Sequence, residues 1–503
     1  MLRLYGLGTP GLWLDEILHY DIAGRAAANP WQSWLLGFEF ENGPLFYGSL
    51  LAGRAAPDAE TSDRLAEAVA GTATIPLLAI AGTLAAGTGA GVAAAWLLAV
   101  APLHVFYSRE GRPYALLALL ATLLLIAFLA RGRRTARLLG WGAALAAPYL
   151  AVSAFQVLAG GLLAALACAG AELALRKVRR WRPAGGEALA GRWGTLALAA
   201  VAGLVLLGLM YGRYPRGPQF GPFPAAHGRL LGFILNALAA WPFWPAPLAA
   251  PAPWFAAAAV AGLAALAPRR PRTATALAAL ALATAGAAWA GMAIPNHFFT
   301  LRYFTPVLPS FLVLAAAGIA GTARGLGWVV ARVQGSPASP AFAPLVAGAA
   351  VATLVACNLE TALACPYQKA DWRAAARAVA IDGRGPGTVL AANHWSAYCI
   401  GYYLRRQRGR IAVAELDAAP RPAVAAAAAR GGCWLVHGGY PQRPALKRWM
   451  RNFPAIWHGR DESIAVFRCT GGAELAGLAP GEPPGKDFSP HPPGSFSAGD
   501  GSR

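Results

Sequence analysis

Residues 91–130 read GVAAAWLLAVAPLHVFYSREGRPYALLALLATLLLIAFLA and place two apolar runs around one charged loop. Each run approaches the length of about 20 residues that an α-helix needs to cross a bilayer. The loop Tyr107–Tyr114 carries Arg109, Glu110 and Arg112. The second run is followed by a basic cluster: Arg131, Arg133, Arg134 and Arg137. This pattern indicates two membrane spans of opposite direction.

Similar apolar runs recur along most of the chain. We expect spans at residues 65–87, 91–106, 115–130, two within 138–175 around a break at 153–156, then at 196–211, 254–266, 273–294, 304–320 and 340–359. The composition agrees, because 57% of the 503 residues are hydrophobic and only 13% are charged. Length alone would suggest about three soluble domains. The hydropathy instead favours an α-helical polytopic membrane protein.

The basic charge has a topological explanation. A net charge of +20 would by itself suggest nucleic-acid binding. The arginines, however, gather in short loops after residues 130, 175, 267 and 322, which is typical of cytoplasmic loops and argues against a nucleic-acid partner. If these loops are cytoplasmic, the opposite face receives segment 1–64 and the loops 107–113, 212–250 and 295–303. The aromatic and acidic loops then converge on one face.

The composition changes after residue 360. We predict a first external loop with an acidic motif at 1–64, a transmembrane bundle at 65–360, an extracytoplasmic α/β domain at 361–470 and a disordered tail at 471–503. Within the α/β domain we expect helices at 371–380, 396–406 and 445–450 and strands at 388–392, 433–437 and 464–468. Asp371 is expected to cap the first of these helices rather than to contact a ligand.

The six cysteines form no CxxC pair and no Cys/His zinc-finger spacing, which argues against a structural zinc site. On the predicted topology, four of them lie outside the cytoplasm, where they could oxidise. These are Cys365, Cys399, Cys433 and Cys469. Their spacing does not identify a disulfide pair.

The segment Gly11–Glu16 reads GLWLDE and places two adjacent acids beside apolar residues. Taken alone, Asp15 and Glu16 are most simply read as the acidic first turn of an amphipathic helix. Their position on the face where the charged loops converge favours a second interpretation, in which they carry chemistry at the water boundary. Glu41 is a second acidic candidate in the same segment, with a solvated loop carboxylate as the alternative.

Six short motifs follow one another in a familiar order. They are Trp13-Leu14-Asp15-Glu16, Asn42-Gly43-Pro44-Leu45-Phe46-Tyr47, Ser62-Asp63-Arg64-Leu65, Tyr107–Tyr114, Arg302-Tyr303 and Asp371-Trp372-Arg373. Through them, residues 10–470 resemble the GT-C class of integral membrane glycosyltransferases. The nearest likeness is to bacterial relatives of protein O-mannosyltransferases and of lipid A aminoarabinose and galacturonic acid transferases.

The resemblance implies a GT-C type helical bundle with a small extracytoplasmic α/β domain. It also implies a polyprenyl-phosphate sugar donor and an acceptor protein, lipid A or glycan at the periplasmic side of the bacterial inner membrane. Asp15 matches the acidic motif of this class and would act as the base in an inverting transfer. Because a lipid phosphate leaves easily, Glu16 would be free to orient Asp15, bind acceptor or help hold a divalent cation.

Positive charge is needed for the donor phosphate at the same face. Arg112 and Arg302 are the main candidates, since a guanidinium fork can bind two phosphate oxygens. Tyr114 and Tyr303 are possible hydrogen-bond partners of that phosphate. The alternative is that these residues are interfacial anchors. The weaker candidates are Arg64 and Arg109.

Metal ligands are not assigned from the sequence. Four histidines could ligate a cation, but single histidines at membrane boundaries are more often interfacial residues. They are His19, His104, His227 and His297.

The chain departs from the class at two places. Only residues 1–12 precede Trp13, too few to span a bilayer. We expect a longer protein with an apolar helix upstream, the alternative being that the acidic segment reaches the outer face unaided. The stretch 149–156 also lacks the histidine that many relatives carry in the middle spans.

Two other functional classes were compared with the transferase. A lipid or polysaccharide transporter or flippase should place ionisable groups or broken helices within the membrane. Here the predicted spans are nearly free of charge, which favours the enzyme. A polymerase or ligase of surface polysaccharide has no reason to share the acidic motif or the external domain.

Overall fold

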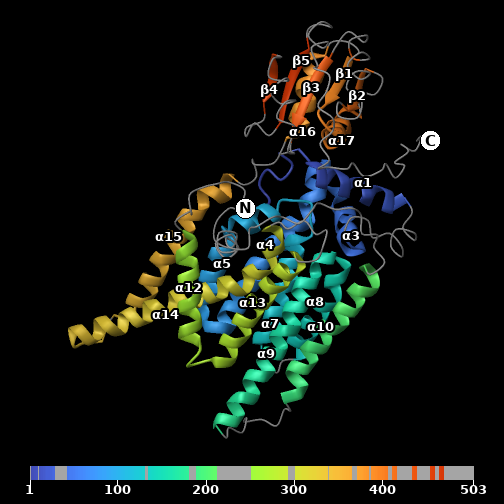
Figure 1. The fold of residues 1–503 in the computed structure, drawn as a ribbon. Coiled ribbons are helices and arrows are strands. Elements are labelled where there is room, and N and C mark those ends of the chain that lie inside the picture. Colours follow the sequence, from blue (N-terminus) through green and yellow to red (C-terminus); the bar gives the residue numbers. More distant parts are fainter. Residues whose placement is uncertain are drawn as a thin grey trace, which may run out of the picture. The chain divides into compact units, whose positions relative to one another are not determined.

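The computed structural model describes residues 2–9, 11–28, 42–130, 134–179, 189–211, 251–292, 301–337, 339–364, 371–383, 387–405, 410–415, 427, 433–438, 454–458 and 464–469. The chain divides into two compact units, residues 1–214 with 223–369, and residues 215–222 with 370–503. The first unit is a helical bundle and the second contains a small sheet (Figure 1).

The helical unit is built from the following elements (Figure 1): α1 (Leu14–Ala28), α3 (Pro44–Ala52), η1 (Gly53–Ala55), α4 (Ala59–Ala86), α5 (Thr88–Ala99), α6 (Pro102–Tyr107), α7 (Tyr114–Leu129), α8 (Arg134–Ala146), η2 (Ala147–Tyr149), η3 (Val152–Ala154), α9 (Phe155–Arg179), α10 (Leu189–Tyr211), α12 (Pro251–Leu266), α13 (Pro271–Met292), η5 (Leu301–Val307), α14 (Leu308–Gln334) and α15 (Phe342–Ala364). Within the described residues, five helical stretches are long and apolar enough to cross a membrane: Ala59–Ala86, Phe155–Ala174, Trp193–Met210, Arg302–Gln334 and Phe342–Leu359. The predicted helical membrane class is confirmed.

Several predicted boundaries differ from the observed ones. Segment 1–64 is helical over much of its length rather than a loop, because it contains α1 and α3. α4 begins at Ala59, where the carboxylate of Asp58 caps it by accepting the backbone N–H of Thr61 at 2.7 Å. The predicted span 91–106 is two helices, since Pro102 opens α6 and has no N–H with which to continue α5.

Small residues bring α12 and α14 into close contact. A Cβ atom on Gly318 would lie 1.8 Å from the carbonyl oxygen of Ala258. A Cβ atom on Gly262 would lie 1.9 Å from that of Leu314. Without side chains at these two positions, the helix backbones approach as they do at many membrane helix interfaces.

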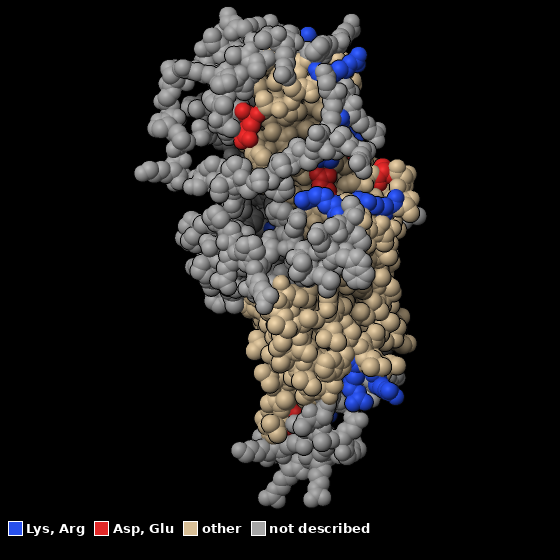
Figure 2. All heavy atoms as spheres, turned by 90° about the vertical axis from the view of Figure 1, so that its right-hand side faces the viewer, with Lys and Arg blue, Asp and Glu red and all other residues tan. Residues whose placement is uncertain are grey.

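The two ends of α4 mark the two ends of the bundle. Arg64 lies near its start, whereas Arg270 donates hydrogen bonds to the carbonyls of Leu84 and Ala85 at its end, at 3.2 and 2.9 Å. The 20 residues between Arg64 and Leu84 span about 30 Å, which is the thickness of the hydrocarbon core. Figure 2 shows charged side chains at two levels of this unit with an uncharged band between them.

The second unit confirms the α/β prediction. Its sheet has the order β2-β1-β3-β5-β4, with β1 (Gly387–Ala391) parallel to both β2 (Ile411–Glu415) and β3 (Cys433–Gly438). Strand β5 (Ile464–Cys469) is antiparallel to β3 and to β4 (Ala455–His458). The helices are α16 (Trp372–Asp382) and α17 (His394–Leu404). Strands β2 and β4 were not predicted, because both are short and alanine weakens the strand signal in β2.

Three smaller predictions concern this unit. Asp371 caps α16 as predicted, accepting the backbone N–H of Ala374 at 3.0 Å. Cys433 lies in register with Cys469 across β3 and β5, and the thiol of Cys433 is free. Cys365, the predicted helix at 445–450 and the predicted tail at 471–503 lie outside the described residues.

Candidate active site

Asp15 lies in the first turn of α1 and meets two arginines from distant parts of the chain. Its Oδ2 is 2.9 Å from Nη1 of Arg112 and 3.5 Å from Nη1 of Arg302. The side chain of Asp15 is 23% exposed, compared with 10% for Arg112 and 14% for Arg302. The structure therefore brings together the predicted base and both predicted phosphate ligands, and the carboxylate remains accessible.

Two tyrosines hold the arginine pair. The Cζ atoms of Arg112 and Arg302 each lie 5.7 Å from the ring centroid of Tyr114, and that of Arg302 lies 5.6 Å from the centroid of Tyr303. Nη2 of Arg112 also donates to the hydroxyl of Tyr114 at 3.4 Å. Such cation–π contacts offset part of the repulsion between two neighbouring guanidinium groups.

The arginine pair has surplus positive charge and unused donors. Among the described residues, Asp15 is the carboxylate that forms ion pairs with Arg112 and Arg302, and Glu110 adds a smaller electrostatic effect on Arg112. The Nε atoms of both arginines are buried and have no hydrogen-bond partner in the described part of the chain. A buried donor without a partner costs about 1–3 kcal/mol. The arrangement therefore favours an anion with several oxygen acceptors, such as a phosphate.

Arg112 remains charged in this environment. Burial lowers the pKa of Arg112 and the Asp15 carboxylate raises it, with Tyr114 and Glu110 acting in the same direction as Asp15. The net pKa lies above the ordinary arginine value. The residue stands in the turn between α6 and α7, so its backbone is fixed by the helix that begins at Tyr114.

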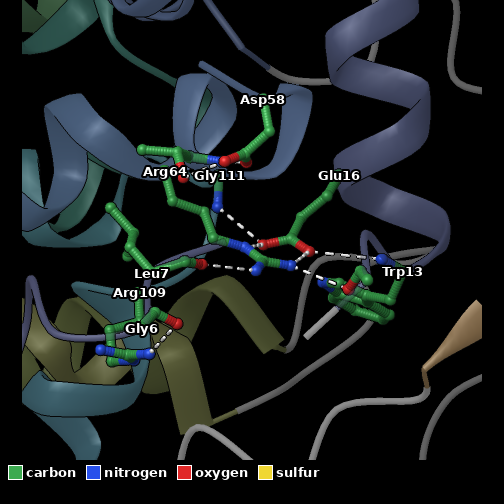
Figure 3. Close-up of polar contacts among 10 residues, drawn as sticks. Gly6, Leu7, Trp13, Glu16, Asp58, Arg64, Arg109 and Gly111 are labelled. Carbon is green, nitrogen blue, oxygen red and sulfur yellow. Dashed lines mark hydrogen bonds and ion pairs between the residues drawn. The ribbon is translucent and has the colours of Figure 1, made fainter. Parts of the chain in front are cut away.

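The surroundings of Glu16 are shown in Figure 3, and they differ from those of its neighbour Asp15, which meets Arg112 and Arg302. Its side chain is fully buried and accepts two bonds from Arg64, from Nε at 2.8 Å and from Nη2 at 2.6 Å. It also accepts the backbone N–H groups of Gly111 at 3.1 Å and of Trp13 at 3.3 Å. Glu16 therefore joins α1 to the turn that carries Arg112, a geometry that fits the first of its three expected roles, the orientation of Asp15.

The two weaker arginine candidates also have structural roles. Arg64 donates to the carbonyls of Leu7 at 3.0 Å and Gly11 at 2.9 Å, in addition to Glu16. Arg109 donates to three carbonyls of the N-terminal segment, those of Leu2, Tyr5 and Gly6. Figure 3 shows the bonds of Arg64 to Leu7 and of Arg109 to Gly6. Both side chains hold the N-terminal segment against the bundle.

The four candidate histidines lie in different places. His19 is buried beside Arg112, which sequence reasoning missed by treating it as a boundary residue. The sequence did contain an indication that His19 lies near the site. It follows Asp15 by four residues, and residues i and i+4 share a helix face. His104 is buried elsewhere and lies 2.8 Å from Nη2 of Arg3. His227 and His297 lie outside the described residues, as does Glu41.

The described residues contain no cluster of side chains arranged to bind the possible divalent cation. Within them, no group of three or more His, Cys, Asp or Glu side chains is placed to hold a metal ion.

Comparison with known proteins identifies the fold. No protein-family model and no curated protein matches the sequence. The solved structure of ArnT from Cupriavidus metallidurans in the apo state is similar, with a TM-score of 0.53 and 14% identity over 95% of this chain and 97% of that chain. The structure of ArnT bound to undecaprenyl phosphate has a TM-score of 0.51 and 14% identity, over 96% and 97% of the two chains. At this identity the likeness concerns the fold, and it confirms the predicted GT-C type bundle with its C-terminal α/β unit.

Proposed function

We propose that the protein is an integral membrane glycosyltransferase that moves a sugar from a polyprenyl-phosphate donor to an acceptor hydroxyl, with inversion and with Asp15 as the base. The observation that carries this proposal is the accessible Asp15 carboxylate beside Arg112 and Arg302, whose Nε donors have no hydrogen-bond partner among the described residues. ArnT, which has the same fold, binds undecaprenyl phosphate in one of its structures. That supports a lipid phosphate as the anion of this site.

The proposed reaction is a single displacement. The acceptor hydroxyl transfers its proton to Asp15 while its oxygen bonds to the anomeric carbon. The bond between that carbon and the phosphate oxygen breaks, and the lipid phosphate leaves with the electron pair. Arg112 and Arg302 stabilise the charge that develops on the leaving phosphate. No acid is needed for departure, because a phosphate is a stable anion at neutral pH.

The site is proposed to lie at the periplasmic face of the inner membrane. Arg64, Arg112 and Arg302 belong to one end of the bundle, while Arg270 and its neighbours lie about 30 Å along α4 at the other end. The positive-inside rule assigns the second end to the cytoplasm. The acceptor, whether a protein, lipid A or a glycan, would then be met on the outer face.

A transfer assay tests the proposal. Purified protein is incubated with radiolabelled polyprenyl-phosphate sugars and candidate acceptors, and Asp15→Asn is compared with wild type. We expect a loss of about 10²–10⁴-fold in rate, the usual contribution of a positioned base. Asp21→Asn, on the same helix, is the matched control and should retain activity. Full transfer by Asp15→Asn would refute the role of Asp15.

A flippase or transporter is the competing function. Its charged groups should lie midway across the membrane. The buried charged residues of α4, namely Glu60, Asp63, Arg64 and Glu67, instead lie in its first three turns. Reconstitution in vesicles separates the two functions, since lipid flipping without sugar transfer would favour the flippase.

A further inference from the structure

We infer that His19 is a positioning residue for donor binding, whose imidazole accepts a hydrogen bond from Arg112 and holds that arginine without cancelling its charge. The inference rests on the proposed function. Asp15 and His19 are one turn apart on α1, and both reach Nη1 of Arg112. Oδ2 of Asp15 lies at 2.9 Å from that atom and Nε2 of His19 at 3.0 Å.

The direction of this hydrogen bond defines the state of the ring. A guanidinium group can only donate, so Nε2 of His19 accepts and the ring proton belongs on Nδ1. Burial lowers the pKa of His19 well below its ordinary value. Arg112 and Arg302 lower it further, and Glu16 opposes them. The imidazole is therefore neutral at physiological pH.

The ring is held in place from a second segment. It is 1% exposed and packs edge-on against Phe46, with ring centroids 5.5 Å apart, and against Tyr47 at 6.1 Å. The side-chain amide of Asn42 lies 3.2 Å from Nε2. These residues belong to the start of α3 and the residue pair before it. A ring fixed on both sides can orient Arg112 precisely enough for a phosphate to meet it.

A neutral acceptor suits the charge balance of the site. Asp15 already offsets one of the two guanidinium charges of Arg112 and Arg302. A carboxylate at position 19 would add a further negative charge beside Arg112 and so reduce the positive charge available to a phosphate. A neutral histidine accepts a hydrogen bond from Arg112 and leaves the positive charge of the two arginines available to a phosphate.

Three variants at position 19 separate these contributions, with undecaprenyl phosphate as the probe and the purified protein in nanodiscs. His19→Phe keeps a ring but loses the acceptor, and we expect about tenfold weaker binding, equivalent to the loss of roughly one hydrogen bond to a charged group. His19→Gln retains an acceptor and should stay within about threefold of wild type. His19→Glu accepts but adds charge, and should bind at least as weakly as His19→Phe.

The matched control is His104→Phe. His104 is also fully buried and also lies within hydrogen-bond distance of an arginine, Arg3, but outside the site. Its replacement should leave lipid-phosphate binding unchanged. In the transfer assay, His19→Phe should raise the KM for donor with little change in the KM for acceptor, a split that a general loss of stability would not produce.

The outcomes distinguish this inference from the proposed function. Wild-type protein that neither binds lipid phosphate nor transfers sugar would overturn both. If wild type binds, equal binding by His19→Phe, or equal weakening by His104→Phe, would overturn the role of His19 alone. Should His19→Phe fail to fold, the comparison of His19→Gln with His19→Glu decides, and tight binding by His19→Glu would contradict the inference.

Discussion

Asp15 and Glu16 are adjacent in the chain, yet their side chains point into different surroundings. Successive helix residues are rotated by about 100°, so two neighbours cannot face the same partner. Asp15 reaches Arg112 and Arg302 and stays 23% exposed. Glu16 reaches Arg64 and is fully buried. One carboxylate is available for proton transfer, and the other fixes the position of the first.

Glu16→Gln tests the buried ion pair. It leaves the guanidinium of Arg64 buried without its counter-charge, and removal of one partner from such a pair typically costs about 3–5 kcal/mol. We expect a loss of that order in the free energy of unfolding, measured by chemical denaturation in detergent. The double variant Glu16→Gln/Arg64→Met should recover part of the loss. A loss of under about 1 kcal/mol in the single variant would show that the pair is not a structural constraint.

At the scale of elements, the site depends on how helices approach one another. The turn that carries Arg112 is tied to α1 through the backbone N–H of Gly111 and the carboxylate of Glu16. A Cβ atom on Gly111 would meet the carboxylate of Asp63, so a larger residue here would displace that side chain. Gly262 and Gly318 allow the backbones of α12 and α14 to approach closely. Helix α14 follows directly on the 3₁₀ turn η5, which contains Arg302, so this packing also positions Arg302.

Gly318→Ala should therefore destabilise the bundle. The added methyl group collides with the carbonyl of Ala258, and overpacking of this kind costs about 1–3 kcal/mol. Gly325→Ala is the matched control on the same helix, because nothing lies within 4 Å of its Cβ position. The control should be neutral or stabilising by up to about 1 kcal/mol through helix propensity. Thermal unfolding of both variants gives the comparison, and equal stability would contradict close packing at Gly318.

For the molecule as a whole, the two ends of the helical unit have different chemistry. The acidic residues and paired arginines of the candidate site occupy the end where α4 begins. Exposed or partly exposed arginines occupy the end where α4 finishes, among them Arg269 and Arg270. The uncharged band between them in Figure 2 suits the hydrocarbon core of a bilayer.

Cysteine labelling tests the orientation. In a background without the six native cysteines, Arg25→Cys places a thiol at an exposed position of α1 and Arg269→Cys places one at the opposite end. A membrane-impermeant maleimide added to intact spheroplasts should label Arg25→Cys and leave Arg269→Cys unlabelled, while both react after lysis. The reverse pattern would place the candidate site in the cytoplasm and exclude a periplasmic acceptor.

The membrane class, the α/β unit and the presence of Asp15, Arg112 and Arg302 on one face could be predicted from the sequence, whereas their ion pairs could not. Hydropathy over about 20 residues is a local property, and it reports directly on whether a helix can enter a bilayer. The site residues were found because the charged loops alternate between two faces, which brings Asp15 and both arginines to one face. Strands β2 and β4 were missed, since short alanine-containing strands are stabilised by their neighbours in the sheet rather than by their own residues.

The sequence by itself determined the spans, the face that bears the acids and the residue types available there. Only the tertiary structure decided the role of each charged side chain. Glu16 pairs with Arg64 across 48 residues of sequence, and His19 meets Arg112 across 93. Partners so distant in the chain are chosen by packing, because burying a charge without a partner is costly and the fold therefore brings an opposite charge or a hydrogen-bond acceptor to it.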